Sequence, residues 1–337
     1  MVKGRLAGAL ALGWLAAAAV FGSGAARAAC VIEQVAQLTV DNTAGGPVTN
    51  GEINGRQVRM LIDTGATAST IWADMTGRLG LSVSPMNGVR LFDLGDETSV
   101  GVIERAQVAL GPNFRARMDV QVAPGPPPQQ RDVDMILGED LLSQFDVEFD
   151  LPDNVVRLLR ARDCQAGQLA YWAKAYSQAT LLPWSRDEPQ MGVTAQLNGK
   201  PVAAMLDTGD TPSTVSFAAA RIAGVAVRPA DEGAMSLVGG LGQGVDEVGI
   251  GTFDSVAIGD ETVRNARLRM AEISRTSEVD RPGLALSREV VDPAPMFIGA
   301  DFFRSHRVLI SPENHAMVFT YGGGPVFRAA DGDGGAN

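Results

Sequence analysis

The sequence predicts an all-β protein that contains two copies of one strand-rich unit and few short helices. Residues 54–85 and 198–229 align without a gap at an offset of 144, and 12 of the 32 positions are identical. Each copy opens with Asn-Gly between two segments of alternating hydrophobicity, the pattern of a tight β-hairpin turn. Short strands joined by tight turns indicate the all-β class.

The same elements follow in the same order in both copies. The strand that returns from the hairpin, at residues 58–62 and 202–206, runs directly into Asp-Thr-Gly. A short helix is predicted next, at residues 71–79 and 215–223, and each helix is followed by a glycine of the kind that ends helices.

Later segments repeat at larger offsets. An apolar-apolar-Gly segment at residues 136–138 recurs at 297–299, so the second copy is 17 residues longer between its aspartate and this glycine. We place the extra residues in the polar stretch 273–295. An aspartate follows each segment, Asp140 and Asp301, and its repetition predicts a structural hydrogen-bonding role. Both copies close with a pair of strands, predicted at residues 147–149 with 155–158 and 307–310 with 317–320.

A length of 337 residues suits two domains. The predicted order is a signal peptide at 1–28, a first lobe at 29–164, a linker of helix-compatible composition at 165–182, a second lobe at 183–322, and a disordered tail at 323–337.

The N-terminus has the layout of a secretory signal. Lys3 and Arg5 precede an apolar stretch at residues 6–21, and Ala26 and Ala28 offer the small residues of a cleavage site. An uncleaved anchor is the alternative, but a run of about 16 apolar residues is short for a membrane span. We therefore expect an exported protein, periplasmic or secreted, with no stable membrane insertion after cleavage.

Two cysteines remain after such a cleavage, Cys30 and Cys164. Because the exported compartment is oxidising, we expect them to form a disulfide bond. Lipid attachment at Cys30 is the alternative, and Arg27 stands where a lipoprotein signal carries leucine.

Composition excludes several classes of function. The formal charge is −11, and it becomes −14 when the signal takes Lys3, Arg5 and Arg27 with it. Binding to phosphate backbones needs clustered basic residues, so nucleic acid is not expected as a partner. With two histidines and no C-x-x-C, the chain offers no recognisable metal cluster, and no metal or organic cofactor is implied.

The repeated Asp-Thr-Gly carries a family resemblance. Residues 61–66 read Leu-Ile-Asp-Thr-Gly-Ala and residues 205–209 read Met-Leu-Asp-Thr-Gly, each with its later apolar-apolar-Gly. This paired pattern resembles the retropepsin-like and pepsin-like aspartic peptidases over residues 45–160 and 190–320. The resemblance implies a bilobal double-barrel fold, the acid protease fold, with the active cleft between two fused lobes.

The resemblance also implies a catalytic pair, Asp63 and Asp207. Hydrolysis without a metal needs one carboxylate to accept a proton from water and a second, protonated carboxyl to polarise the carbonyl. Two close carboxyls share a proton, as aspartic proteases are known to do. The support of this pair is assigned, by the same resemblance, to the threonine and glycine of each motif: Thr64, Gly65, Thr208 and Gly209.

By resemblance, an extended peptide or protein substrate would lie between the pair and two flaps, at residues 89–102 and 235–251. The candidate substrate-binding residues are Thr67, Thr211, Phe92, Leu94, Leu237, Val238, Gly239 and Gly240. One chain supplies both aspartates, so we expect a monomer with an internal pseudo-dimer. An arrangement in which each lobe pairs with a lobe of another chain is the alternative.

Two departures from the family pattern leave an alternative open, a non-catalytic peptide-binding or scaffold protein of the same fold. Asp210 stands where the first copy has Ala66, and an extra acid could raise a pKa or disturb the shared proton. Neither flap contains a tyrosine of the kind that the pepsin flap carries.

Overall fold

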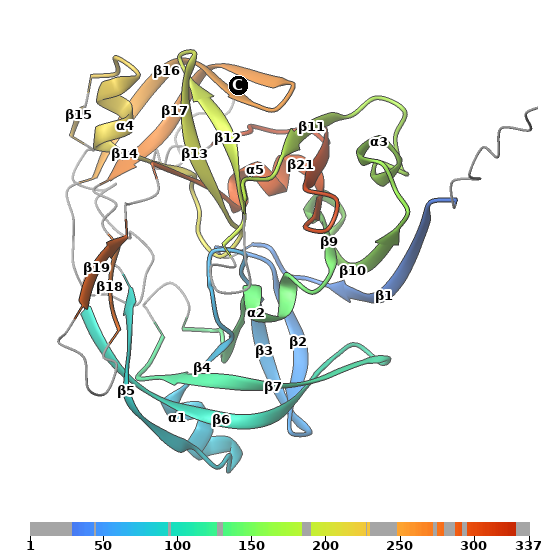
Figure 1. Ribbon diagram of the computed structural model, residues 1–337, viewed down its shortest axis with the longest axis vertical. Helices are drawn as coiled ribbons and strands as arrows, with labels where there is room; N and C mark the ends of the chain where they lie inside the picture. The colour runs from blue at the N-terminus through green and yellow to red at the C-terminus, as the bar shows by residue number, and fades with distance from the viewer. Residues whose placement is uncertain are drawn as a thin grey trace, which may run out of the picture.

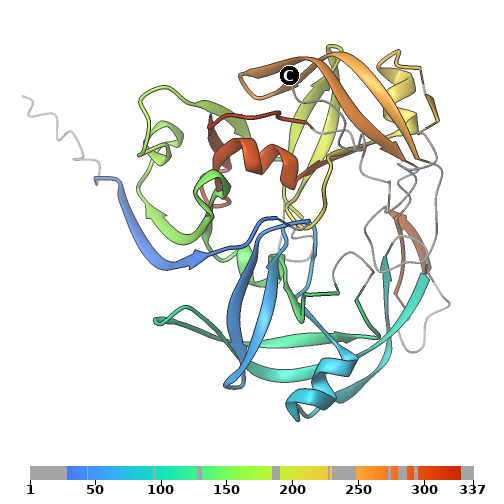
Figure 2. The ribbon, with the colours of Figure 1, turned by 180° about the vertical axis from the view of Figure 1, so that it is seen from behind.

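The computed structural model describes residues 29–43, 45–93, 96–126, 131–183, 190–226, 228–229, 248–271, 275–279, 287–291 and 295–327. Strands dominate, and they form three sheets. Two of the sheets close into barrels, one from each half of the chain, and the third lies beside both barrels (Figures 1 and 2).

The first barrel has six strands. In ring order they are β2 (Val48–Ile53), β3 (Arg56–Ile62), β8 (Met135–Leu137), β4 (Thr70–Trp72), β7 (Phe114–Ala123) and β6 (Asp96–Leu110). The ring closes because β6 pairs with both β2 and β7.

The second barrel repeats this ring. Its strands are β12 (Gly192–Leu197), β13 (Lys200–Asp207), β20 (Met296–Gly299), β14 (Thr214–Ser216), β17 (Glu261–Ala271) and β16 (Val248–Ile258). Pairing of β12 with β16 closes it, and β15 (Arg228–Pro229) adds to the outer edge of β16. The predicted all-β double-barrel fold is therefore confirmed.

The repeated Asn-Gly pairs form the predicted hairpin turns. Asn54 and Gly55 have φ of 49° and 76°, and Asn198 and Gly199 have φ of 49° and 75°. Positive φ at both central residues is what a type I′ turn requires, and Asn-Gly supplies it at low strain. These turns set the register that delivers each following strand to its Asp-Thr-Gly.

The helices are short. They are α1 (Ala73–Leu79), α2 (Glu139–Leu142), α3 (Ala166–Leu169), α4 (Phe217–Ile222) and α5 (Ala300–Ser305), with a 3-10 turn at Leu151–Asp153. The prediction started α1 and α4 two residues too early. Residues 71–72 and 215–216 are instead the ends of β4 and β14, because ladder pairing within the barrels holds them extended.

The third sheet is made by both halves of the chain. Its order is β1 (Val31–Thr39), β10 (Val155–Arg162), β9 (Asp146–Asp150), β21 (His306–Ser311), β22 (Ala316–Tyr321) and β11 (Ser177–Thr180). The two predicted closing strand pairs, β9 with β10 and β21 with β22, are confirmed. Pairing of β9 with β21 joins them into one sheet, which the sequence did not indicate.

Two segments between and after the lobes differ from expectation. The predicted helix-compatible linker contains only one short helix, α3, before β11 joins the shared sheet. At the other end, Val326 and Phe327 of the predicted disordered tail pack against the core. Residues 328–337 of that tail and the predicted signal at 1–28 lie outside the described residues.

The extra length of the second copy includes two strands, one of which pairs with a strand of the first lobe. β18 (Arg275–Val279) and β19 (Ser287–Val291) pair with each other, and β18 also pairs with β5 (Ser84–Asp93) of the first lobe (Figure 1). The β5–β6 hairpin is the first predicted flap, so the second lobe extends the sheet to which this flap belongs.

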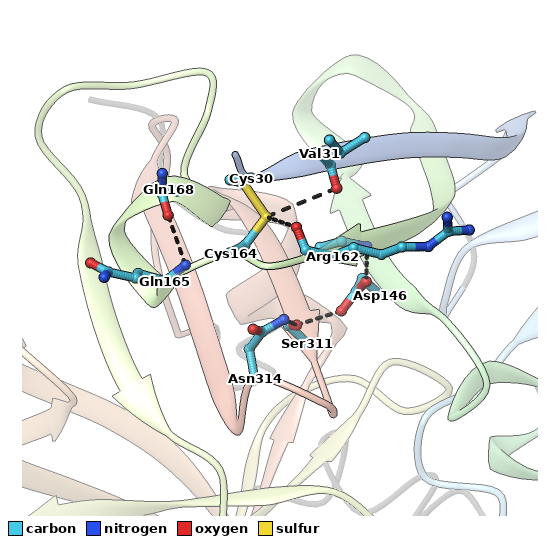
Figure 3. Close-up of a disulfide and its surroundings, with 10 residues drawn as sticks. Cys30, Val31, Asp146, Arg162, Cys164, Gln165, Gln168, Ser311 and Asn314 are labelled. Carbon is cyan, nitrogen blue, oxygen red and sulfur yellow. Dashed lines mark hydrogen bonds between the residues drawn. A yellow bond between two sulfur atoms is a disulfide. The ribbon is translucent and has the colours of Figure 1, made fainter. Parts of the chain in front are cut away.

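The predicted disulfide is present and fastens one edge of the shared sheet (Figure 3). Cys30 precedes β1, Cys164 follows β10, and their sulfur atoms are bonded. Beneath this edge, the Asp146 carboxylate accepts a hydrogen bond from the Ala161 backbone N–H at 2.6 Å and another from the Ser311 hydroxyl. The covalent bond therefore joins the ends of two strands of the first half, while the Ser311 hydrogen bond links this sheet edge to a strand of the second half. Among the described residues, no helix is long and apolar enough to span a membrane.

We predict that replacing both cysteines, C30S/C164S, lowers the free energy of unfolding by about 2–4 kcal/mol. The bond closes a loop with a sequence separation of 134, and its loss restores conformational freedom to the unfolded chain. Denaturant titration should show the same loss in the wild type after reduction. Equal stability of the oxidised wild type and the double variant would contradict this account.

Candidate active site

The two Asp-Thr-Gly loops meet face to face between the barrels. Asp63 directly follows β3 and Asp207 ends β13, and both strands end in the region between the barrels (Figure 1). A β-carbon on Gly65 would lie 2.5 Å from Asp207 Cγ, and one on Gly209 would lie 2.2 Å from Asp63 Cγ. Each glycine thus leaves room for the carboxyl group of the opposite lobe, and the two side chains are joined by a hydrogen bond.

Each carboxylate also accepts a bond from its own loop. The Gly65 backbone N–H donates to Asp63 Oδ1 at 2.7 Å, and the Gly209 backbone N–H donates to Asp207 Oδ1 at 3.2 Å. These bonds fix the orientation of each carboxyl group relative to its loop. Asp63 is buried and Asp207 is half-buried.

The threonines cross-link the two loops. The Thr64 backbone N–H donates to Thr208 Oγ1 and the Thr208 backbone N–H donates to Thr64 Oγ1, both at 3.1 Å. Thr208 Oγ1 in turn donates to the Ile62 carbonyl at 2.8 Å. Because both threonines are buried, these bonds are shielded from water and lock the loops in one relative position.

Behind each loop, the later apolar-Gly segment makes a second matched set of contacts. A β-carbon on Gly138 would lie 2.7 Å from the Ala66 carbonyl oxygen, and one on Gly299 would lie 2.8 Å from that of Asp210. Only glycine allows this close an approach.

The aspartates that follow these glycines have the predicted hydrogen-bonding role. Asp140 accepts from the Ser69 hydroxyl at 2.7 Å, and Asp301 accepts from the Ser213 hydroxyl at 2.5 Å. Each serine oxygen also accepts the backbone N–H of the segment's glycine, at 3.1 and 2.8 Å. The scaffold behind the two loops is thus nearly identical in the two lobes.

The electrostatics of the pair favour a shared proton. Burial raises the pKa of Asp63 to about 6, although the bonds from Gly65 and Asp207 oppose this shift. The negative charge of Asp210 also raises the pKa of Asp63. A carboxyl group that has this pKa and is hydrogen-bonded to a second carboxyl group can hold a proton in mildly acidic solution.

The extra acid of the second lobe, Asp210, is held by a cation. Arg269 on β17 donates from Nη2 to Asp210 Oδ2 at 2.5 Å and from Nε to Thr214 Oγ1 at 2.6 Å. The Arg269 side chain is buried, with 7% exposed. The pair therefore leaves little net charge behind the loop of Asp207.

The first lobe has its own extra acid, Glu139, which the sequence analysis did not select. It is fully buried at the start of α2, and its backbone N–H donates to the Ala66 carbonyl at 2.8 Å. Burial raises the pKa of Glu139 well above its usual value, and the charges of Asp63 and Asp140 add to this effect. The sequence carried one signal for Glu139, because the equivalent position in the second copy of the repeat holds a neutral residue, Ala300.

The candidate substrate-binding residues are only partly described. Thr67 is exposed beside the first loop, while Thr211 Oγ1 accepts a hydrogen bond from Arg304 at 3.3 Å. Phe92 lies on β5, but its side chain is outside the described part of the structure. The remaining candidates, Leu94, Leu237, Val238, Gly239 and Gly240, lie outside the described residues.

Two residues that the sequence analysis missed brace the loops. Arg304 on α5 donates to the Asn42 and Gly45 carbonyls, both at 2.9 Å, and so ties the second lobe to the chain before β2. Gln190 donates to the Gly65 carbonyl at 3.0 Å. Neither residue belongs to a repeated motif, so the sequence alone offered no signal for them.

Comparisons with known proteins agree with this geometry. Residues 49–144 match the family described as "gag-polyprotein putative aspartyl protease", and residues 193–302 match the family described as "Aspartyl protease". The chain belongs to the retropepsin-like aspartyl proteases. Each of its two halves carries one such domain, an arrangement that fits the internal repeat.

One curated relative matches part of this chain. The UBA domain-containing protein Mud1 of Schizosaccharomyces pombe is 30% identical over 118 residues. The match covers 32% of this chain and 32% of Mud1, so it spans about a third of the relative's length.

We predict that T208V destabilises the protein by about 1–3 kcal/mol, while T208S is close to the wild type. Valine keeps the shape of threonine but leaves the buried Thr64 N–H without its acceptor and the Ile62 carbonyl without its donor. Serine keeps the hydroxyl. Denaturant unfolding of the three proteins tests this, and equal stability of T208V and T208S would show that the hydroxyl bonds do not hold the loops.

We also predict that the protein is more stable at about pH 4 than at about pH 7. The pKa values of Asp63, Glu139, Asp140 and Asp146 are all raised in the folded state, chiefly by burial. As pH rises above about 4, the unfolded chain releases these protons first, so stability falls until the folded pKa values are passed. The raised pKa of Asp63 contributes to this fall between about pH 4 and pH 6.

Thermal unfolding across this pH range measures the effect. D63N should flatten the dependence, because asparagine does not titrate. A wild-type melting temperature that rises from pH 4 to pH 7 would contradict the prediction.

Proposed function

We propose that the protein is an aspartic endopeptidase in which Asp63 and Asp207 activate a water molecule for hydrolysis of a peptide bond. The observation that carries this proposal is the mutual approach of the two carboxyl groups. Each stands against the glycine of the opposite loop, with a hydrogen bond between them. Paired carboxyls that share a proton can supply both the base and the acid that the reaction needs.

The reaction requires the singly protonated pair, in which the carboxyl groups of Asp63 and Asp207 share one proton. The ionised carboxyl accepts a proton from water as the water oxygen attacks the carbonyl carbon. The protonated carboxyl donates to the carbonyl oxygen, where negative charge develops. Collapse of the tetrahedral intermediate then breaks the C–N bond, and the leaving nitrogen takes a proton from the pair. The pair titrates as a unit, so neither aspartate is assigned one fixed role.

We propose an extended peptide or protein as substrate, bound between the loops and the two flaps. Thr67 is exposed next to the first loop and is available for such a contact, whereas the Thr211 hydroxyl is already engaged by Arg304. The apolar flap residues named from the sequence would supply side-chain contacts. We further propose that the mature protein works outside the cytoplasm, which a disulfide between Cys30 and Cys164 favours.

We propose a monomer as the working unit. Both aspartates come from one chain, and the threonine bonds between the loops are intramolecular. A dependence of specific activity on protein concentration would instead favour pairing of lobes between chains.

We predict that D63N and D207N each reduce peptide cleavage at least about 100-fold, because an amide can neither accept the water proton nor share one. The measurement is cleavage of a mixed peptide library between about pH 3 and pH 8. D74N is the matched control, because Asp74 is an exposed aspartate on α1. It should retain wild-type activity.

Wild-type rates in D63N and D207N would refute the dyad. A folded wild type that binds peptides but cleaves none across the whole pH range would favour the second hypothesis, a non-catalytic peptide-binding protein. A folded wild type with neither binding nor cleavage would oppose both.

A further inference from the structure

Glu139 is a buried acid whose carboxyl group has no hydrogen-bond partner among the described residues. Its side chain is fully buried, and neither Oε1 nor Oε2 forms a hydrogen bond within the described part of the chain. Buried carboxylates normally bind donors or cations, because an unpaired buried charge carries a penalty of several kcal/mol. A neutral carboxylic acid avoids most of that penalty. The environment therefore fits the protonated form of Glu139.

The charged groups around Glu139 lead to the same conclusion. The charges that act on it belong to Asp63, in the loop after β3, and Asp140, the next residue on α2, and both are acids. The Ser69 hydroxyl and backbone N–H already bind the Asp140 carboxylate. An ionised Glu139 would thus add a second buried negative charge behind Asp63, with no donor to hold it.

The two lobes solve this problem differently. In both, the residue after the glycine donates its backbone N–H to the residue after Asp-Thr-Gly: Glu139 to Ala66 at 2.8 Å, and Ala300 to Asp210 at 2.7 Å. Each lobe therefore has one acid and one alanine at this contact, on opposite sides of the hydrogen bond.

Among the residues that the structure describes, only the second lobe supplies a cation at this contact. Arg269 pairs with Asp210 and lies opposite Thr214 in the β14–β17 ladder. The matching position in the first lobe, opposite Thr70 in the β4–β7 ladder, holds the neutral Gln121. The second lobe balances its extra acid with arginine. The matching position of the first lobe holds no cation, so the structure favours a protonated acid there.

We propose that the competent state of the site holds two protons, one shared by Asp63 and Asp207 and a second on Glu139, whose neutral carboxyl positions the Asp63 loop. This inference rests on the proposed endopeptidase function. When Glu139 ionises, its carboxylate must become hydrated, and this requires α2 to move. The hydrogen bond from the Glu139 backbone N–H to the Ala66 carbonyl transmits that movement to the Asp63 loop. Glu139 is a positioning residue in this scheme, since it acts through the loop and does not contact the peptide.

The test compares the pH dependence of kcat/KM for the wild type and E139Q. Glutamine has the shape of the protonated glutamic acid but cannot ionise. Two essential protons give the wild type a limiting slope of about −2 in log kcat/KM against pH on the alkaline side, while E139Q retains one and approaches about −1. The two proteins should agree near pH 5, and their ratio should then grow about tenfold per pH unit in the limiting range.

Two variants serve as controls. E139A copies Ala300 of the second lobe and should also approach a slope of about −1, with lower activity throughout because of the cavity. D210N removes the acid that Arg269 holds and should keep the slope of about −2, although its midpoint moves to lower pH. The same limiting slope in the wild type and E139Q would overturn the proposal.

A second measurement does not depend on activity. Because the folded pKa of Glu139 is raised, the wild type should lose thermal stability relative to E139Q as pH rises from about 5 to about 9. If the wild type cleaves nothing, the endopeptidase proposal fails while this comparison still decides the protonation of Glu139. If the melting temperatures of the two proteins change with pH in the same way across this range, Glu139 does not hold the second proton.

Discussion

The rest of the site depends on the reciprocal bond between the two threonines of the Asp-Thr-Gly loops. Thr64 and Thr208 exchange backbone-to-hydroxyl hydrogen bonds across the boundary between the barrels. This contact fixes the distance between the loops, and the glycines then allow the opposing carboxyls to approach. The shared six-stranded sheet supports the same arrangement from the side, since β9 and β21 come from different halves of the chain.

Two carboxyls held this close restrict the charge that can be placed behind them. The second lobe places an acid there but neutralises it with buried Arg269. The first lobe places Glu139 there without a cation, and burial favours its protonated form. The scaffold is therefore close to symmetric in its backbone, while its response to pH arises mainly in the first lobe. As the pH rises, the acids of the first lobe lose their protons, whereas Arg269 of the second lobe keeps its charge.

Features that are local or repeated could be predicted from the sequence, whereas long-range contacts could not. The hairpin turns at Asn54 and Asn198, the paired Asp-Thr-Gly loops and the disulfide all followed from local motifs or from a forced pairing. The starts of α1 and α4 were wrong because the barrel ladders hold those residues as strands. The joining of β9 to β21, the placement of β18 beside β5, and the bracing by Arg304 and Gln190 are long-range contacts with no sequence signature. Glu139 was visible only as an acid opposite alanine in the repeat, and its importance required knowledge of its burial.

We propose that Asp63 and Asp207 form one proton-sharing unit. The most direct test is a carbon-13 NMR titration of the aspartate carboxyl carbons in the wild type, with D63N and D207N used for assignment. If this proposal is correct, the two signals titrate together in two well-separated steps, the upper one near pH 6, and removal of either aspartate leaves one step at a changed pH. Two independent single-step titrations near pH 4, each unaffected by loss of the other residue, would contradict it.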